Sequence, residues 1–563
     1  MIRETVSDVM LETLRSLGVR YLFANLGTDY PPIVESLAKY RSAGEMVPEV
    51  VLCAHENTAI TAAHGYALAT GRGQGVFVHV GVGTQNLGGS LHNAWTGRIP
   101  MLIFAGRSPV ETRGHVHGGR DNPIHFFQDV RDQAGVIRQF CKWEFNLELP
   151  EQAAYAFQRA VRLMQGEPTG AVYMTAAREV LGMPVGDMIS DSPERSALPE
   201  WGAFSDEAAR RLAESLHRAE RPLIITSYSG RQPEAVASLL ELSETLRVPV
   251  VEAVAQFLNF PRNHPHHWGY RAGAAVKEAD FILLLDTDVP WIPKAGMPER
   301  NVPVVQLDVD PLKPHITMWD YPVTESHAVL TAPALARVLG HARQLAPPDN
   351  ARTEARNEWL ARHRPPAAGN GAGGDALTVA AMARAVAEAI GEEGVLFDET
   401  ITQSDLVRSV TAQTRPGTYF GLPGGSLGWG GGSALGYKLA RPEAEVTWMV
   451  GDGSYLFSVP SSLYMTAARV NTPFLTVILN NGGWNAVKAA TDRVYGNGGE
   501  AAKSGEYHHR PGATDALEQV AGAFGAYTAR VETLPELRAK LTEGREAVAR
   551  GQCAVINAMV TDG

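Results

Sequence analysis

The sequence has few cysteines, no long uncharged hydrophobic run and no basic tract. Its three cysteines in 563 residues, Cys53, Cys141 and Cys553, lie far apart in apolar surroundings. This spacing excludes a disulfide-rich scaffold and is typical of reduced thiols that serve as small core residues. The first residues contain no signal-peptide core, and no apolar segment is long enough to span a membrane. We therefore expect a cytoplasmic protein.

Positive charge is also scarce. Lysine and arginine number 50 against 61 aspartates and glutamates, which gives a net charge of −11. Because nucleic-acid binding depends on clustered basic residues, this balance argues against such a partner. What is present is the composition of an ordinary globular protein, with 45% hydrophobic and 20% charged residues. A chain of this length is too long for one core and implies about three or four domains.

Hydrophobic patterns divide the chain into three segments in which predicted strands and helices alternate. Residues 1–187, 201–345 and 376–563 each show this alternation, which is typical of doubly wound α/β domains built on a parallel sheet. In the first segment we expect strands at Tyr21–Ala24, Val50–Ala54, Gly75–Val80, Met101–Ala105 and Ala171–Met174. In the second we expect strands at Pro222–Thr226, Pro249–Glu252, Phe281–Asp286 and Val304–Asp308. Residues 346–375, which are rich in proline and glycine, predict a flexible connection that includes one helical piece.

The most informative pattern of the third segment is a strand–helix–strand unit. Two apolar runs rich in β-branched residues, Val446–Val450 and Phe474–Leu479, predict buried parallel strands. Between them, Val459–Arg469 carries a proline near its start and predicts a crossover helix. In a right-handed unit of this kind both strands end at the same edge of the sheet, where open α/β sheets bind ligands.

Polar residues follow both of these strands. Asp452 comes after the first strand, between Gly451 and Gly453, and Asn480 and Asn481 end the second. We expect the two glycines to let the backbone turn tightly and approach a ligand closely. A carboxylate, an amide oxygen and a nearby main-chain carbonyl form an all-oxygen set that suits Mg²⁺ bound together with phosphate oxygens.

With 26 residues between Gly453 and Asn480, this stretch resembles the diphosphate-binding motif of thiamine diphosphate (ThDP) enzymes. The resemblance implies that Asp452, the side chain of Asn481 and the carbonyl of Gly483 hold Mg²⁺. It also implies that the diphosphate lies against Gly451, Asp452, Gly453 and Ser454. The three α/β segments match the pyrimidine-binding, central and diphosphate-binding domains of the ThDP-dependent decarboxylase and acetolactate synthase superfamily, over essentially the whole chain.

Glu56 follows the predicted strand Val50–Ala54 and opens a helix rich in small residues, Asn57–Thr70. One interpretation is a glutamate placed at a helix N-terminus, where the helix dipole favours a negative charge. The resemblance implies another, because a glutamate of ThDP enzymes in this position hydrogen-bonds a pyrimidine nitrogen. We expect burial to raise the pKa of Glu56 enough for it to share a proton there. That proton favours the imino form of the cofactor, which deprotonates its own thiazolium carbon.

Two further stretches resemble cofactor-binding segments of the family. In the glycine-rich run 423–436, Leu427 occupies the position of a large apolar residue that holds the cofactor in its bent shape. After the predicted strand Val395–Phe397, Thr402 and Gln403 lie where a helix starts, so we expect their polar groups to face the diphosphate oxygens.

The stretch from Glu56 to Gly106 resembles the benzoylformate decarboxylases without a gap. These enzymes have a histidine at the position of His79, 23 residues after the glutamate, and a serine where this chain has Thr28. His79 has a structural interpretation, as a hydrogen-bonded residue at a strand end. The resemblance implies that it exchanges a proton with the substrate and that Thr28 also belongs to the catalytic site. Acetolactate synthases lack this histidine.

Other positions depart from the benzoylformate decarboxylases. Their second active-site histidine, from the central domain, has no counterpart here, where the run 286–293 stands instead. Phe127-Gln128-Asp129 and residues 141–143 resemble acetolactate synthases. His115 and His117 lie in a predicted loop, and their spacing is poor for a metal site, so we expect solvated side chains.

The resemblance implies an enzyme that uses ThDP and Mg²⁺ to cleave or form the bond beside the carbonyl carbon of a 2-oxo acid. Loss of CO₂ leaves an enamine, which is either protonated, releasing an aldehyde, or attacks a second carbonyl. Two alternatives stay open within the superfamily, an acetolactate synthase-type carboligase and an acyl-CoA lyase of the oxalyl-CoA decarboxylase type. A third is a ThDP-binding regulatory subunit, against which the set Glu56, Asp452 and Asn481 argues.

Assembly and a second cofactor complete the expectations. Glu56 and Asp452 lie in different predicted domains but have to hold opposite ends of one cofactor. Family members do this across a subunit interface, so we expect a homodimer or homotetramer. In the central domain, residues 227–230 stand where a Gly-x-Gly-x-x-Gly fingerprint would follow the first strand. The sequence therefore favours the absence of FAD without excluding a flavin or a nucleotide.

Overall fold

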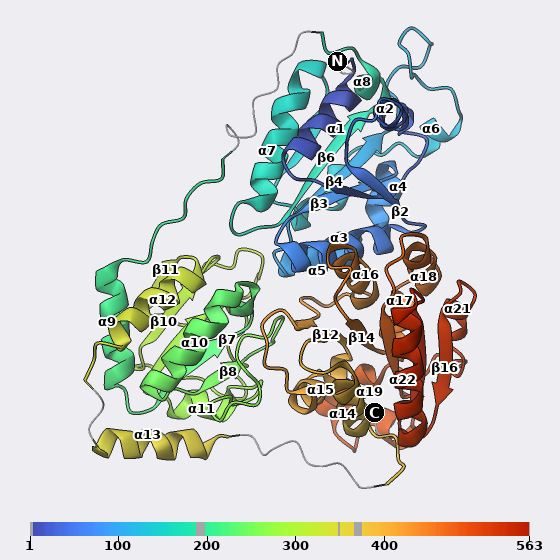
Figure 1. Cartoon of the computed structure of the whole chain (residues 1–563). Coiled ribbons are helices and arrows are strands. Elements are labelled where there is room, and N and C mark those ends of the chain that lie inside the picture. Colours follow the sequence, from blue (N-terminus) through green and yellow to red (C-terminus); the bar gives the residue numbers. More distant parts are fainter. Residues whose placement is uncertain (1–3, 187–196, 347–349, 365–373, 562–563) are drawn as a thin grey trace. The chain divides into compact units, whose positions relative to one another are not determined.

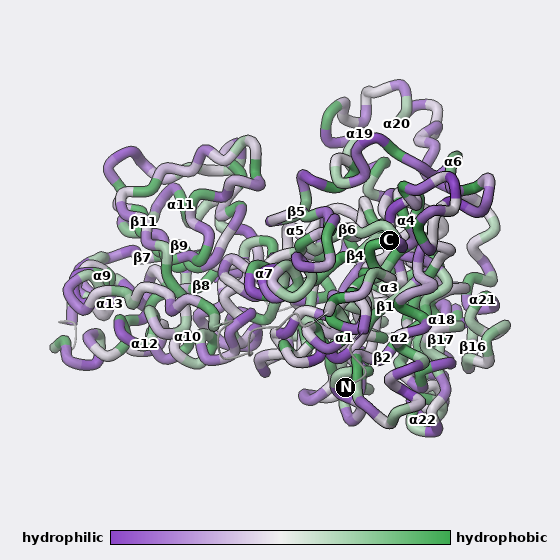
Figure 2. The backbone as a smooth tube through the Cα atoms, turned by 90° about the horizontal axis from the view of Figure 1, so that it is seen from above, coloured by the Kyte–Doolittle hydropathy of each residue, from purple (hydrophilic) through white to green (hydrophobic). Residues whose placement is uncertain are grey.

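The computed structural model describes residues 4–186, 197–346, 350–364 and 374–561. They form three parallel sheets, each packed between helices, as the sequence predicts (Figure 1). The strands in the middle of each sheet are almost entirely buried, and Figure 2 shows hydrophobic residues concentrated along them. Among the described residues, no helix combines the length and the apolar character needed to cross a membrane.

The first sheet has the strand order β2-β1-β3-β4-β6-β5, and each neighbouring pair is parallel. Its strands are β1 (Tyr21–Asn25), β2 (Glu49–Leu52), β3 (Gln74–Val78), β4 (Met101–Arg107), β5 (Glu144–Leu147) and β6 (Ala171–Ala177). Its helices are α1 (Val6–Ser16), α2 (Pro31–Ser42), α3 (Glu56–Thr70), α4 (Val80–Asn86), α5 (Gly88–Thr96), α6 (Ile124–Phe127), α7 (Ala153–Gln165) and α8 (Arg178–Gly182). The five predicted strands are confirmed, and β5 is an additional edge strand.

The central sheet has the order β11-β10-β9-β7-β8. Its strands are β7 (Pro222–Thr226), β8 (Val250–Glu252), β9 (Phe281–Leu285), β10 (Val304–Asp308) and β11 (Glu325–Ala328). Its helices are α9 (Asp206–Arg218), α10 (Pro233–Leu246), α11 (Gly273–Glu278) and α12 (Thr331–Ala342). The four predicted strands are confirmed. The strand β11 was not predicted, because its residues Glu-Ser-His-Ala lie largely exposed at the sheet edge and lack an apolar run.

The helical piece expected within residues 346–375 is α13 (Asn350–Arg362). The helix α13 is fixed to the central domain, whereas residues 347–349 and 365–373 of the expected flexible connection lie outside the described residues. The buried guanidinium of Arg356 donates hydrogen bonds to main-chain carbonyls at the ends of α9 and α10, among them that of Leu246. The indole N–H of Trp359 donates to the carbonyl of Pro222 at 2.9 Å.

The third sheet has the order β13-β12-β14-β15-β17-β16. Its strands are β12 (Val395–Glu399), β13 (Tyr419–Gly421), β14 (Val446–Gly451), β15 (Leu475–Asn480), β16 (Tyr527–Val531) and β17 (Ala554–Met559). Its helices are α14 (Val379–Ile390), α15 (Ser404–Thr411), α16 (Gly430–Ala440), α17 (Asp452–Phe457), α18 (Pro460–Arg469), α19 (Asn485–Tyr495), α20 (Glu500–Ser504), α21 (Gln519–Gly522) and α22 (Leu534–Ala549). β14 and β15 pair in parallel with Gly451 opposite Leu479, so the predicted strand–helix–strand unit is confirmed.

Helices α3 and α16 pack against each other through glycines. A Cβ atom on Gly436 of α16 would lie 1.8 Å from the carbonyl oxygen of Ala62 in α3, and a Cβ on Gly65 would lie 1.9 Å from that of Ser433. The helix backbones therefore touch directly, which side chains larger than hydrogen would prevent. This contact explains why the helix that begins at Glu56 has small residues where it faces α16.

Alanine in place of Gly436 puts a methyl group where the Ala62 carbonyl lies. We expect Gly436→Ala to lower the stability by about 1–3 kcal/mol, as overpacking does in other cores. Thermal and urea unfolding will measure this. Gly340 in α12 is the matched control, because a Cβ there meets nothing within 4 Å. Gly340→Ala should leave stability unchanged or raise it slightly, and equal stability of both variants would contradict the direct helix contact.

Candidate active site

Three neighbouring strands of the first sheet carry polar residues to one edge. β1 is followed by Asp29, β2 by Glu56 and β3 by His79. Because β1 lies between β2 and β3 and all three are parallel, their carboxyl ends lie side by side. The sequence-predicted residues Glu56 and His79 thus reach the same edge, as the ligand-binding rule for open α/β sheets requires.

Glu56 occupies the first turn of α3. The helix starts there because Nδ1 of His55 accepts a hydrogen bond from the main-chain N–H of Asn57 at 3.0 Å. The Glu56 side chain is buried, with 7% of the residue exposed, and its Oε2 accepts a hydrogen bond from Nδ2 of Asn86 at 3.0 Å. Its Oε1 lies close to Gly83, where an added Cβ would be 3.1 Å away. The carboxyl group is therefore held in a defined position by α4.

His79 precedes α4 and is hydrogen-bonded through both ring nitrogens. Nδ1 lies 2.5 Å from Oδ1 of Asp29, and Nε2 lies 3.1 Å from Oε1 of Gln128. The hydrogen bond to Asp29 raises the pKa of His79, against the opposing effect of burial, and the charge of Glu56 adds to the rise. The imidazole is therefore more readily protonated at neutral pH than a free histidine.

The sequence reasoning missed Asp29 and did not connect Gln128 with His79. Asp29 directly follows Thr28 at the end of β1, so a carboxylate at a strand end was the available signal. Thr28 itself has an exposed side chain, and its carbonyl accepts a hydrogen bond from Nη1 of Arg178 at 3.3 Å. Its catalytic role stays a prediction.

On the third sheet, the ends of β14 and β15 bring the predicted side-chain ligands Asp452 and Asn481 together, while the carbonyl of Gly483 accepts a hydrogen bond from the N–H of Asn485. Oδ1 of the buried Asp452 accepts a hydrogen bond from the N–H of Gly453 at 2.6 Å, and Oδ2 accepts one from the N–H of Gly483 at 2.8 Å. The same Gly483 N–H lies 3.3 Å from Oδ1 of Asn481. One carboxylate and one amide oxygen thus converge within hydrogen-bonding reach of a single main-chain group.

This donor set fits Mg²⁺. Burial raises the pKa of Asp452, although the surrounding main-chain N–H groups partly offset the effect. A buried carboxylate with no cationic side chain among its hydrogen-bond partners is stabilised by a bound cation. Hard oxygen ligands of this type are those that Mg²⁺ prefers. Among the described residues no group of three or more His, Cys, Asp or Glu could hold a metal, so the candidate Mg²⁺ set has a single charged ligand.

The glycines around Asp452 do not form the expected tight turn, and their close approach to a ligand stays a prediction. Gly451 has φ of −70° and open space around an added Cβ, so its backbone does not require glycine. Gly453 is required by packing, because its Cβ would lie 2.2 Å from the indole Nε1 of Trp484. The turn after β15 instead uses Gly482, with φ of 79°. Ser454 is buried in the first turn of α17.

The loop that carries Leu427 is fastened on both sides. The main-chain N–H and carbonyl of Ser426 are hydrogen-bonded to the side chain of Asn93 in α5. The carbonyl of Gly428 accepts a hydrogen bond from Nδ2 of Asn57, the residue after Glu56, at 3.3 Å. The half-buried Leu427 therefore sits in a fixed loop whose anchor is adjacent to Glu56.

The remaining predicted positions lie at surfaces. Thr402 and Gln403 form the 3₁₀-helix η6 (Ile401–Gln403) at the carboxyl end of β12; Thr402 is exposed and Gln403 partly so. Their contact with a diphosphate stays a prediction. His115 and His117 are exposed on the loop after β4, as expected for solvated side chains.

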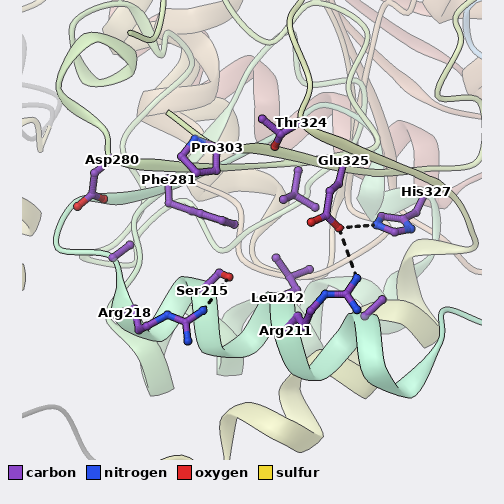
Figure 3. A pocket seen from close by; sticks show the side chains of 13 residues that line it. Arg211, Leu212, Ser215, Arg218, Asp280, Phe281, Pro303, Thr324, Glu325 and His327 are labelled. Carbon is purple, nitrogen blue, oxygen red and sulfur yellow. Dashed lines mark hydrogen bonds and ion pairs between the residues drawn. The ribbon is translucent and has the colours of Figure 1, made fainter. Parts of the chain in front are cut away.

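A cavity of about 510 Å³ lies elsewhere, in the central domain (Figure 3). It is bounded by α9 and by the amino ends of β9, β10 and β11, and its walls include Arg211, Phe281 and Glu325. Glu325 lies 3.8 Å from Arg211 and 3.4 Å from His327, as the dashed lines in Figure 3 mark. None of the predicted site residues lines this cavity.

Family profiles match all three domains. The thiamine pyrophosphate enzyme profiles match residues 4–136 (N-terminal TPP binding domain), 209–325 (central domain) and 401–558 (C-terminal TPP binding domain). The chain belongs to the thiamine pyrophosphate enzyme family. Thiamine pyrophosphate is another name for ThDP, so the expected cofactor and the enzyme class are confirmed.

Curated relatives of this ThDP enzyme are similar over most of their length. The probable 2-ketoarginine decarboxylase AruI of Pseudomonas aeruginosa is 27% identical over 82% of this chain and 80% of its own. Benzoylformate decarboxylase of the same organism is 25% identical over 86% of this chain and 87% of its own. Acetolactate synthase of Arthrospira platensis is 25% identical over 89% of this chain and 86% of its own.

Solved structures agree in fold. The ThDP-dependent 4-hydroxybenzoylformate decarboxylase of Rhodococcus jostii RHA1 superposes with a TM-score of 0.80 at 21% identity, covering 99% of both chains. Benzoylformate decarboxylase of Polynucleobacter necessarius gives a TM-score of 0.81 at 21% identity, covering 99% of this chain and 98% of its own. At this identity the similarity establishes the three-domain architecture alone.

Proposed function

We propose that this ThDP enzyme is a Mg²⁺-dependent decarboxylase of 2-oxo acids, similar to the benzoylformate decarboxylases. The observation that carries the proposal is His79, which lies on the same sheet edge as Glu56 and is hydrogen-bonded to Asp29 and Gln128. A histidine with a raised pKa is suited to donate a proton at neutral pH. Two of the relatives named above are decarboxylases of 2-oxo acids by their names.

Residues at the carboxyl-end edges of the first and third sheets have different roles in this proposal. Glu56 would hold the pyrimidine end of the cofactor, while Asp452, Asn481 and the carbonyl of Gly483 would hold Mg²⁺ at the diphosphate end. Bound ThDP supplies the electron sink that accepts the electron pair left when CO₂ departs. His79 then delivers a proton to the substrate-derived carbon or oxygen, which favours release of an aldehyde.

Carboligation is the second candidate, as in acetolactate synthases. It is supported by the Arthrospira platensis relative and by the run Phe127-Gln128-Asp129, whose Gln128 contacts His79. A third candidate, cleavage of acyl-CoA substrates, is supported by the 2-hydroxyacyl-CoA lyase 2 of Homo sapiens, which is 24% identical over 84% of this chain. These candidates differ in the product they release.

A panel of 2-oxo acids distinguishes decarboxylation from carboligation. We expect the purified protein with ThDP and Mg²⁺ to release an aldehyde from at least one aromatic or cationic 2-oxo acid, detected by NMR. His79→Gln should lower this turnover by about 10²-fold or more, since general acid–base groups contribute at this level. A hydroxyketone as the main product would support the second candidate, and full activity of His79→Gln would contradict the role of His79.

Removal of the single charged metal ligand should abolish cofactor binding. We expect Asp452→Ala to show no Mg²⁺-dependent ThDP binding by calorimetry while its circular dichroism spectrum is unchanged. Asp515→Ala is the control, because this exposed carboxylate of the same domain has no predicted ligand role. Wild-type ThDP affinity in Asp452→Ala would contradict the assignment of Asp452 as a Mg²⁺ ligand.

We also propose that the active enzyme is a homodimer or a homotetramer with sites at subunit interfaces. Subunits that carry Glu56→Gln or Asp452→Ala should each be inactive alone. If a site combines Glu56 of one subunit with Asp452 of the other, an exchanged heterodimer contains one intact site and one doubly impaired site. We expect about half of the activity of one wild-type dimer. A mixture that stays inactive after proven subunit exchange would show that each site is built within one chain.

A further inference from the structure

The carboxylate of Asp29 has two hydrogen-bonding partners. One is a ring nitrogen of His79, which can donate or accept a hydrogen bond, and the other is a main-chain N–H, which can only donate. Its Oδ1 lies 2.5 Å from Nδ1 of His79, and its Oδ2 accepts a hydrogen bond from the main-chain N–H of Val80 at 3.2 Å. A main-chain N–H can only donate, so Oδ2 must act as an acceptor. A carboxylate facing an imidazole nitrogen likewise requires a proton on that nitrogen. The geometry therefore assigns the proton of neutral His79 to Nδ1.

Nε2 of His79 is the nitrogen left for chemistry. It faces Oε1 of Gln128 at 3.1 Å, and the ring retains 20% side-chain exposure, whereas the side chain of Asp29 has none. The amide nitrogen of Gln128 is buried and has no hydrogen bond among the described residues. Half a rotation of this amide would place its NH₂ group on Nε2, so Gln128 can pair with the protonated or the neutral ring.

The backbone around the Asp29–His79 contact has no room for a side chain at two neighbouring glycines. A Cβ on Gly27 would lie 2.0 Å from Nδ1 of His79, and a Cβ on Gly106 would lie 1.9 Å from Oδ2 of Asp29. Val80, which directly follows His79, has φ of 30°, a conformation that is rare for a β-branched residue. Two glycines and one strained residue thus accommodate the Asp29–His79 contact, which argues against a chance surface pair.

We propose that Asp29 is a positioning residue that fixes the tautomer and orientation of His79, so that Nε2 exchanges the proton with the substrate and Gln128 holds that nitrogen until the substrate arrives. The inference rests on the proposed catalytic role of His79. The charged groups that face the ring are Asp29, from the β1–α2 loop, and Glu56, at the start of α3; both raise the pKa of His79.

Asp29→Asn tests the proposal because one oxygen of Asp29 faces a main-chain N–H, which can only donate, and the other faces a ring nitrogen, which can donate or accept. In the variant the single amide oxygen has to accept the Val80 N–H, which leaves the NH₂ group facing Nδ1 of His79. Nδ1 must then be unprotonated, so the neutral ring changes to the Nε2–H tautomer. A similar exchange underlies the loss of activity of aspartate-to-asparagine variants in serine proteases.

The readout is NMR of protein labelled with ¹⁵N and ¹³C in histidine alone, with the His79 signals assigned by their absence in His79→Gln. We expect wild-type neutral His79 to carry its proton on Nδ1, and Asp29→Asn to carry it on Nε2 and to titrate at lower pH. Asp206→Asn is the control, since Asp206 is exposed and pairs with His341 at 2.9 Å. It should change the signals of His341 and leave those of His79 unchanged.

Turnover provides the second readout. Asp29→Asn should lower kcat by about 10²-fold or more with little change in KM or ThDP affinity, and the pH-profile limb that reports His79 should move to lower pH. An Nε2–H tautomer in the wild type would overturn the proposal even if the variant failed to fold. So would an unchanged tautomer and pH profile in a folded Asp29→Asn protein. Failure of the proposed function has a different signature, namely full turnover in His79→Gln.

Discussion

Parallel strands joined by right-handed crossovers all end at the same edge of their sheet, and both halves of the candidate site depend on this constraint. In the first sheet it brings Asp29, Glu56 and His79 together from three strands that are separated in sequence. In the third sheet it brings Asp452 and Asn481 together from β14 and β15. No single motif creates either edge. Strand order does, and strand order follows from burying the apolar faces of each sheet under its helices.

Asp29 and Asp452 are two buried carboxylates that are stabilised in different ways. Asp29 faces one main-chain N–H and the imidazole of His79, which can carry a charge. Its hydrogen bond to the imidazole raises the pKa of His79. Asp452 is surrounded by main-chain N–H groups and has a raised pKa, so its charged form is under-compensated. The first arrangement is complete within the protein, whereas a bound cation would complete the second. This difference in charge balance supports a proton-transfer role for one edge and a metal-binding role for the other.

The sequence predicts the elements whose cause is local and misses those whose cause is distant. Runs of β-branched residues identify the central strands, but the edge strands β5 (Glu144–Leu147) and β11 (Glu325–Ala328) have no such run. Gly453 follows a strand, yet its requirement comes from Trp484, 31 residues later. The partnership of Asp29 with His79 depends on β1 pairing with β3, with β2 on the other side of β1. That register cannot be read from one sequence, although the carboxylate after β1 was visible.

Charge at the first edge links substrate entry to the protonation of His79. Asp29 and Glu56 both act on His79 in the sense that favours its charged form. Under the proposed function the substrate is a 2-oxo acid, which arrives as an anion at neutral pH. An edge with two carboxyl groups and a neutral imidazole would repel it, whereas the imidazolium offsets part of that negative potential. The imidazolium form of His79 therefore both favours entry of the anionic substrate and can later donate a proton. Asp29 stabilises this charged form through its contact with Nδ1.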